Sequence, residues 1–130
     1  MKINLTTIYV DDQEKALAFY TDVVGFTKKN DFTNGPYRWL TVASPEDPDG
    51  TELQLAANDS PHGSAYQHAL RAQNQPAAMF ATSDIDADYE RMNDRANFTM
   101  PPFDAPWSRV ATFDDTCGNL VQLVQLKAWQ

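Results

Sequence analysis

The chain contains twice the stretch that begins with Trp39-Leu40-Thr41-Val42-Ala43-Ser44 and runs through Asp47 and Gly50 to Leu53-Gln54-Leu55. The second copy begins with Trp107-Ser108-Arg109-Val110-Ala111-Thr112 and runs through Asp115 and Gly118 to Val121-Gln122-Leu123. At a constant offset of 68 residues, Trp, Val, Ala, Asp, Gly, Gln and Leu recur at seven of seventeen positions. Chance is a poor explanation for this agreement. We interpret the chain as an internal duplication and expect any site to lie between the halves.

Each copy predicts a strand, an acidic turn and a second strand. β-branched and aromatic residues favour strands, and the Pro, Asp and Gly of residues 45–50 and 114–118 favour turns. Side chains alternate along a strand, so Gln54 and Gln122 should share one face. Their apolar neighbours should point to the other face, under helices: Leu53, Leu55, Val121 and Leu123.

The residues before each copy predict a strand followed by a helix. Residues 3–10 alternate as a strand does, Asp11 or Asp12 can cap a helix over residues 16–23, and Gly25 ends it. A strand from Phe26 to Phe32 and the hairpin signal Asn34-Gly35 complete a β-α-β-β-β unit.

The second half repeats this order of elements. Residues 77–82 predict a strand, and Asp84 or Asp86 caps a helix carrying Ile85, Tyr89 and Met92. Pro101-Pro102 is expected to limit the strand that follows. We therefore expect one α+β domain, with a first module at about residues 1–57, a connector with a short helix (Ser64 to Ala72) at 58–76, and a second module at about 77–130.

Composition excludes several classes of partner and location. No apolar run approaches the roughly 20 residues of a membrane-spanning helix. The alternating N-terminus predicts a strand and not a signal peptide, and Cys117, the only cysteine, excludes an intrachain disulfide, so we expect a cytoplasmic protein. The net charge of −8 opposes nucleic acid and anionic membranes. The acidic excess either only maintains solubility or favours a neutral or cationic small molecule.

Several motifs together resemble one family. They are Tyr9-Val10-Asp11-Asp12, Lys15-Ala16-Leu17-Ala18-Phe19-Tyr20, Val24-Gly25-Phe26, Asp47-Pro48-Asp49-Gly50 and Cys117-Gly118-Asn119. With the paired β-α-β-β-β units, the chain resembles the vicinal oxygen chelate superfamily, which includes glyoxalase I, bleomycin-resistance proteins and ring-cleaving dioxygenases. The resemblance covers essentially the whole chain. It implies two curved, four-stranded mixed sheets around a cavity, often completed by a homodimer partner.

The enzymes of this family hold a divalent metal on four strands, and the resemblance carries those positions to Leu5, Gln54, Ala78 and Gln122. Leu and Ala have no donor atom, and two neutral amides do not compensate a dication. A shift of one residue would offer Glu52 or Asn4 but no histidine, because His62 and His68 are both in the connector. We therefore predict no metal, no cofactor and no catalytic residue.

Gln54 and Gln122 are the main candidates for ligand contacts. Two amides in an apolar cup can orient a ligand, and the equally weighted alternative is that they bond to each other or to buried water. Aromatic residues are candidates for the walls, although most aromatics in such a domain are core. The predicted ligand-binding set is Gln54, Gln122, Trp39, Phe103, Trp107, Arg109 and Tyr9.

The remaining polar candidates have weaker support. Arg38 and Arg109 recognise an anion if they point inward, but surface pairing with carboxylates is the commoner outcome. We expect surface histidines at positions 62 and 68. Cys117 has no basic neighbour in sequence to activate it, and Trp129 either contacts a partner or is exposed.

Three functions remain open from the sequence. The first is a metal-free protein that binds or sequesters a small aromatic or cationic compound, as bleomycin-resistance relatives do, and that forms a homodimer. The second is a glyoxalase-like lyase or dioxygenase-type metalloenzyme, supported by fold alone. The third is a metal-independent enzyme using Tyr, Arg or His, for which no positioned pair is visible.

Overall fold

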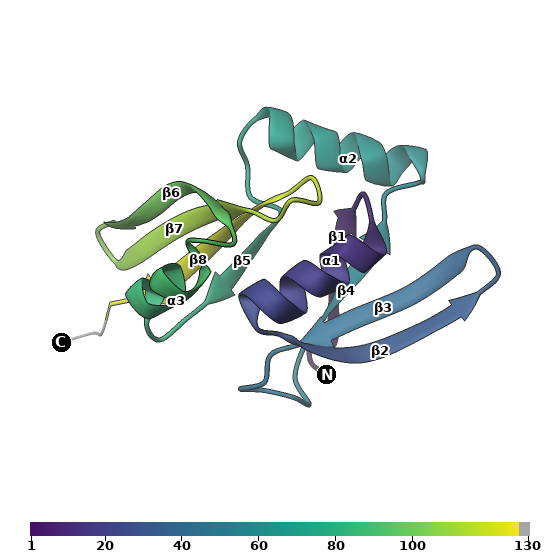
Figure 1. Ribbon diagram of the computed structural model, residues 1–130, viewed down its shortest axis with the longest axis horizontal. Coiled ribbons are helices and arrows are strands. Elements are labelled where there is room, and N and C mark those ends of the chain that lie inside the picture. Colours follow the sequence, from purple (N-terminus) through teal and green to yellow (C-terminus); the bar gives the residue numbers. More distant parts are fainter. Residues whose placement is uncertain (128–130) are drawn as a thin grey trace.

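The computed structural model describes residues 1–127, which form two four-stranded sheets (Figure 1). The first module contains β1 (Leu5–Val10), α1 (Gln13–Ala18), the π-helical η1 (Phe19–Val24), β2 (Thr27–Asn34), β3 (Tyr37–Ala43) and β4 (Glu52–Ala57). Helix α2 (Pro61–Ala72) connects it to the second module, which contains β5 (Ala78–Ala81), α3 (Ile85–Met92), β6 (Asn97–Asp104), β7 (Ser108–Asp114) and β8 (Leu120–Leu126). Trp129 lies outside the described residues.

The two modules have the same topology. The strand orders are β1-β4-β3-β2 and β5-β8-β7-β6, and in each sheet the first strand pairs parallel with the last. This confirms the α+β class and the paired β-α-β-β-β units. The two sheets are separate, and their strands do not join into one closed sheet within the chain (Figure 1).

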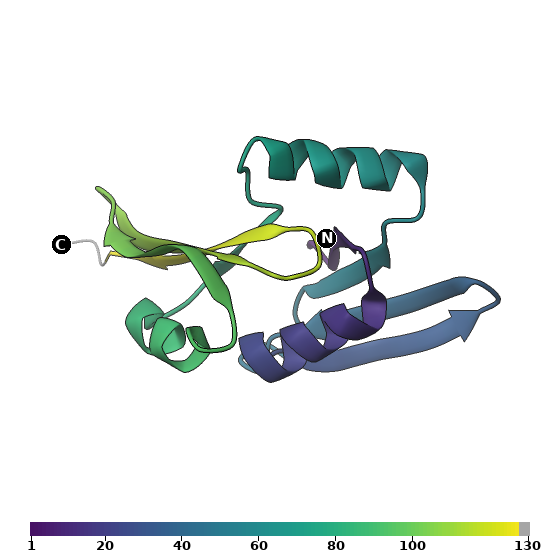
Figure 2. The same ribbon diagram turned by 45° about the horizontal axis from the view of Figure 1, so that its top comes forward.

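Helices α1 and α3 lie on one side of the sheets and α2 lies on the other (Figure 2). The predicted caps are present: the Asp12 carboxylate accepts from the Lys15 N–H at 3.1 Å, and the Asp84 carboxylate accepts from the Ala87 N–H at 3.1 Å. Gly25 ends η1 with φ of +100°, a left-handed conformation that glycine adopts without a steric penalty. Local sequence therefore sets where these helices begin and end.

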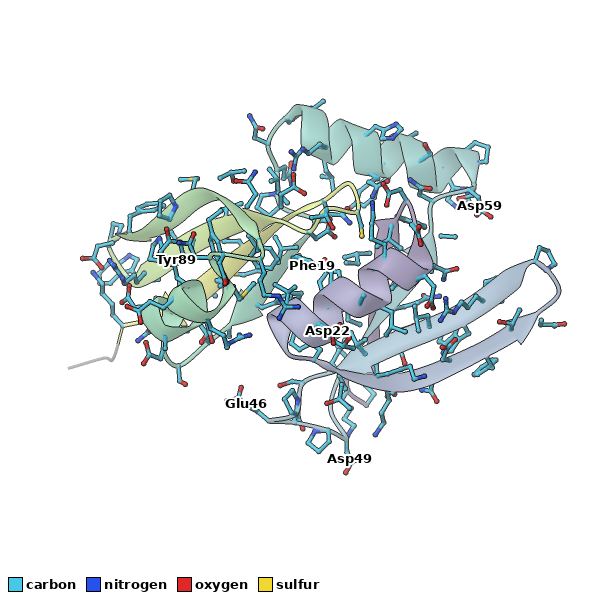
Figure 3. All side chains as sticks on the ribbon, viewed as in Figure 1. Phe19, Asp22, Glu46, Asp49, Asp59 and Tyr89 are labelled. Carbon is cyan, nitrogen blue, oxygen red and sulfur yellow. The ribbon has the colours of Figure 1, made fainter. Side chains whose placement is uncertain are left out.

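One hydrophobic core extends through both modules. Phe19 lies near the middle of the molecule, with its ring centroid 5.9 Å from that of Phe113 (Figure 3). Phe26 and Phe80 meet edge to face at 5.0 Å across the junction. The predicted inward residues of β4 and β8 are all buried in this core: Leu53, Leu55, Val121 and Leu123.

A buried polar network joins the modules and the connector. Tyr20 of the first module donates its hydroxyl to Asp115 of the second at 2.6 Å. The Asn119 amide donates to Asp115 at 2.8 Å and to the Tyr9 carbonyl at 2.7 Å. Gln67 of α2 donates to the carbonyls of Tyr9 and Cys117, each at 2.9 Å. These bonds satisfy polar groups that would otherwise be buried without partners, and they fix how the modules meet.

The gapless alignment of the two copies is wrong for their first strands. Gln54 pairs with Thr41, whereas Gln122 pairs with Thr112, not with Arg109 as the constant offset requires. The reason is turn length, because the β3–β4 turn (residues 44–51) is three residues longer than the β7–β8 turn (115–119). As a result, Trp39 lies within β3, but Trp107 precedes β7.

The prediction that two prolines limit the second strand of module two is also wrong. Strand β6 runs through Pro101 and Pro102 to Asp104, with a register shift against β7 between Met100 and Phe103. It is the edge strand of its sheet, where a missing N–H can face outward without losing a ladder bond. Within residues 1–127, no helix is long and apolar enough to cross a membrane.

Candidate functional site

One face of each sheet is covered by a helix, α1 in the first module and α3 in the second. We call the opposite faces, which these helices do not cover, the two open faces. Paired residues share a face, so strand register identifies their members. On the first open face, Gln54 lies between Thr7 of β1 and Thr41 of β3. On the second, Gln122 lies between Met79 of β5 and Thr112 of β7. The two glutamines therefore occupy equivalent positions, as predicted, but on separate sheets.

Gln54 has one firm hydrogen bond. Its Oε1 accepts from the Thr7 hydroxyl at 2.8 Å, whereas its Nε2 lies 3.5 Å from the Tyr37 hydroxyl, which is long for a hydrogen bond. The side chain is 8% exposed. Beside it, the Glu52 carboxylate accepts from Thr41 at 2.7 Å and from Asn30 at 2.9 Å. The first open face is therefore polar at its base, and the Gln54 amide has donor capacity left.

Aromatic side chains line the outer part of the first open face. Phe32 of β2 stacks on Trp39 of β3 with centroids 6.5 Å apart, and Tyr37 is on the same face. Phe32 is 59% exposed and Tyr37 is 53% exposed. Such exposed rings next to an amide with donor capacity left provide both apolar and polar contacts for a small molecule.

The second open face is more apolar. The half-buried Gln122 side chain makes no hydrogen bond to any residue in the range 1–127. The same face carries large apolar side chains that are more than one third exposed: Met79, Met100, Phe103 and Leu126. An amide with unused donors and acceptors on a face with exposed apolar groups is suited to a ligand or to a partner surface.

The structure does not bring all of the predicted residues to the open faces. Arg109 pairs with Gln125 on the helix-facing side and donates to Asp86 of α3 at 3.0 Å. Arg38 likewise pairs with Asp31 at 2.8 Å on the α1 side of its sheet. Both arginines have the solvated carboxylate partners that the sequence favoured.

Tyr9 and Trp107 lie at the margins. The Tyr9 ring contacts His62 and Tyr66 of α2 edge to face, at 6.5 and 6.4 Å, so α2 covers it. Trp107 is 69% exposed just before β7. Tyr9 pairs with Ala56 and is therefore on the same face as Gln54, but under α2. The predicted residues that share an open face are thus Gln54 with Trp39 and Tyr9, and Gln122 with Phe103.

Comparison with known proteins agrees with this geometry. Residues 2–123 match the Glyoxalase/Bleomycin resistance protein/Dioxygenase superfamily. The chain belongs to this superfamily. It is 46% identical over 126 residues to the uncharacterized protein YurT of Bacillus subtilis strain 168, covering 96% of this chain and 99% of that one.

Solved structures with the fold of this superfamily superpose well on this one. UcmS2 superposes with a TM-score of 0.82 at 29% identity, covering 95% of this chain and 97% of its own. TnmS3, an antibiotic binding protein from Streptomyces sp. CB03234, superposes with a TM-score of 0.79 at 31% identity, covering 98% and 97%. The resemblance inferred from the motifs is thereby confirmed.

The donor atoms at the superfamily's metal positions do not fit a divalent metal. Leu5 shares the first open face but pairs with Glu52, and Ala78 pairs with Val121 on the helix-facing side, so Met79 takes the place beside Gln122. This corrects the sequence assignment by one residue for Ala78, and by two residues for Leu5, because Thr7 is the residue beside Gln54. A one-residue shift moves a strand side chain to the other face, whereas a two-residue shift keeps it on the same face. Methionine and threonine next to two neutral amides supply neither the charge nor the nitrogen donors that such metals need. Within residues 1–127, no three His, Cys, Asp or Glu side chains form a metal-binding group.

Sequence reasoning missed Thr7, Met79 and Met100 as members of the open faces. Alternation along β1, β5 and β6 could have shown which residues share a face with these three. The register that places them near Gln54 and Gln122 depends on strand pairing, which alternation does not give. The reactive candidates are not at these faces. His62 and His68 are exposed on α2, and Cys117 is fully buried, where burial raises the pKa of its thiol to about 12.

Two cavities lie where the modules meet, and both are bordered by Met79 of the second open face. A cleft of about 870 Å³ lies between the modules and is bordered by Gly25–Phe26, the β3–β4 turn, β5 and α3; we call it the junction cleft. A smaller cavity of about 270 Å³ adjoins it between β4 and β5. None of the seven predicted ligand-binding residues lines either cavity.

Proposed function

We propose that this protein is a metal-free small-molecule-binding member of its superfamily that holds a neutral or cationic, partly aromatic compound against its open faces. The observation that carries the proposal is the pair of equivalent amides, Gln54 and Gln122, each with unused hydrogen-bonding capacity beside exposed apolar side chains. Such amides orient a ligand but offer no acid–base chemistry near neutral pH. Sequestration of the bound compound is the activity that this chemistry supports.

Two further facts support binding over catalysis, and a third concerns the charge of the ligand. The one carboxylate beside Gln54, that of Glu52, is already engaged by Thr41 and Asn30. TnmS3, which is 31% identical, is an antibiotic binding protein. The net charge of −8 favours cations over anions as ligands.

The binding arrangement that we propose involves two copies of the chain. Neither Gln54 nor Gln122 lines the junction cleft or the smaller cavity, and ligand sites usually bury most of the ligand in a concave cavity. A homodimer in which open faces meet would enclose the amides and cover the exposed apolar side chains.

The test is a thermal-shift screen of neutral, cationic and anionic aromatic compounds, followed by calorimetry on the compounds that stabilise the protein. Gln54→Leu and Gln122→Leu should each weaken binding by about tenfold or more, since ~1.4 kcal/mol is a factor of ten. Gln75→Leu, which removes an exposed amide elsewhere, should leave affinity unchanged. Loss of stability in the two variants without any ligand found would mean that the amides are structural.

Elemental analysis tests the metal-free part of the proposal separately. Purified protein should contain far less than one Zn²⁺, Ni²⁺, Mn²⁺ or Fe²⁺ per chain, because Thr7, Met79 and the two amides are uncharged and the carboxylate of Glu52 is already engaged by Thr41 and Asn30. Stoichiometric metal that disappears in the Gln54→Ala, Gln122→Ala double variant would instead support a metalloenzyme of glyoxalase or dioxygenase type.

A further inference from the structure

The junction cleft has an apolar floor built from both modules. Phe26 of the first module and Phe80 of the second form its centre, with their rings edge to face at 5.0 Å. Met79, Met92 and Leu123 extend the floor. Phe26 also stacks on the buried Tyr20, so the floor is continuous with the core and held in place by it. The volume of about 870 Å³ is in the range of sites for drug-sized molecules.

The rim of the junction cleft is acidic. Four carboxylates line it, and Arg91 is the single basic residue among the lining residues: Glu46, Asp47, Asp84, Asp88 and Arg91. The guanidinium of Arg91 is already engaged, because it donates to the carbonyls of Val23 at 2.7 Å and Val24 at 3.1 Å. It is therefore not available to attract an anion into the cleft.

The four carboxylates of the rim differ in the hydrogen bonds and ion pairs that they already form. Asp84 caps α3, and Asp88 accepts from Thr82 and from Arg91. The side chains of Glu46 and Asp47 form no hydrogen bond or ion pair with any residue among 1–127. Glu46 lies on the turn that projects beyond β3 and β4 (Figure 3). The carboxylates of Glu46 and Asp47 thus lie unpaired, within the described residues, at the edge of an apolar floor.

We propose that the junction cleft is a second small-molecule site, which takes an organic cation with a flat apolar body. The body packs on Phe26, Phe80 and Met92, and the cationic group reaches Glu46 and Asp47. Carboxylates near a low-dielectric floor favour a cation over an anion of the same shape. This site goes beyond the function proposed above, because neither Gln54 nor Gln122 lines it.

The methionines provide a site-specific readout, since the chain has four and they lie in different places. Met92 lines the cleft only, Met79 borders both the cleft and the second open face, Met100 is on the second open face, and Met1 is at the N-terminus. We would titrate protein labelled with ¹³C at the methionine methyl groups with 1-naphthylmethylammonium, and with 1-naphthoate as the anion of matched shape. The cation should shift the Met92 signal in a saturable way, and the anion should not. A shift of Met79 does not distinguish the two sites, because Met79 borders both.

Two variants test the two halves of the interaction. Glu46→Gln with Asp47→Asn should weaken binding of the cation roughly fivefold, as expected for loss of two partly exposed charge pairs. Asp59→Asn with Glu90→Gln changes the net charge equally at exposed positions that do not line the cleft, and it should leave affinity unchanged. Ala87→Phe, at an exposed lining position on α3, should block the cleft and abolish the Met92 shift.

Each other outcome overturns the proposal. Equal binding of cation and anion would remove the role of the rim carboxylates. No saturable shift of Met92 would mean that the cleft does not accept this class of molecule, whether because a second copy fills it or because it stays closed. Shifts at Met100 that vanish in Gln54→Leu or Gln122→Leu, with Met92 unchanged, would place the probe on the open faces and leave the proposed function intact.

Discussion

Asp115 is a carboxylate enclosed between the two modules. Four donors surround it: the Tyr20 hydroxyl, the Asn119 amide and the backbone N–H groups of Cys117 and Asn119. Burial nevertheless raises the pKa of Asp115, because removal of a charge from water outweighs the bonds that stabilise it. Burial, together with the charge of Asp115, also raises the pKa of Tyr20 well above its usual range.

Removal of the Tyr20 hydroxyl should destabilise the protein in a pH-dependent way. We expect Tyr20→Phe to lower the free energy of unfolding by about 1–3 kcal/mol near neutral pH, because it leaves a buried carboxylate without one donor.

The sign of the pH dependence follows from the raised pKa of Asp115. The folded protein binds the proton of the Asp115 carboxyl group more tightly than the unfolded chain does. The stabilisation from this proton is therefore complete below the pKa that Asp115 has in the unfolded chain, and it is lost as the pH rises through the pKa that Asp115 has in the folded protein. The Tyr20 hydroxyl limits that loss of stability because its hydrogen bond stabilises the ionised form of Asp115. The deficit of the variant, measured by urea unfolding, should be larger near pH 7 than near pH 3.5, and equal deficits would contradict this account.

Cys117 should be inert in the folded protein. Its side chain is fully buried and burial raises its thiol pKa to about 12, so very little thiolate is present or accessible near pH 8. Ellman's reagent should react with about one thiol per chain in denaturant and with almost none without it. Rapid labelling of the native protein would show that the turn opens readily.

At the level of elements, the β7–β8 turn is held against α2. Gly118 has φ of +104°, and a Cβ placed there would lie 2.5 Å from the Gln67 amide nitrogen. Gln67 in turn bonds to the carbonyls of Tyr9 and Cys117. The connector helix is therefore part of the junction between modules and not only a linker.

Gly118→Ala tests this contact, with Gly35→Ala as its control. Gly35 also has a positive φ, +62°, but a Cβ placed there would have no atom within 4 Å. We expect Gly118→Ala to cost roughly 2–4 kcal/mol from backbone strain and overpacking together, and Gly35→Ala about 1–2 kcal/mol from strain alone. Thermal or urea unfolding measures both, and similar losses in the two variants would mean that Gln67 moves aside without cost.

At the scale of the whole molecule, the open faces expose a large apolar surface. Phe32, Met79 and Leu126 are each more than half exposed, although they belong to sheets. Exposed apolar side chains gathered on a sheet face usually mark a binding surface. The net charge of −8 per chain opposes close approach of two copies, so salt should strengthen their association.

We expect the protein to be a homodimer. Light scattering at micromolar concentration should give about twice the chain mass of 14.6 kDa, and more dimer at higher salt. Met100→Lys with Phe103→Lys, on the second open face, should shift the protein toward monomer, whereas Ile3→Lys, at an exposed residue before β1, should not. A monomer at all salt concentrations would reject the arrangement in which open faces meet.

The amino-acid sequence by itself determined the order of elements and which residues point inward on β4 and β8. Asp12, Asp84 and Gly25 act as predicted because a cap needs only its own few residues. Gln54 and Gln122 share equivalent faces because alternation along a strand has a fixed period of two residues. The superfamily motifs lie in these same local segments.

Only the tertiary structure decided which residues are neighbours across strands and modules. The register of β3 and β7 depends on turns of different length, so Thr112, and not Arg109, lies beside Gln122. Met79 rather than Ala78 is on the second open face because of the register in which β5 pairs with β8. The junction cleft combines residues from a turn of one module and a helix of the other. Such contacts join residues far apart in the chain, and they are set by the packing of a shared core, which no local pattern encodes.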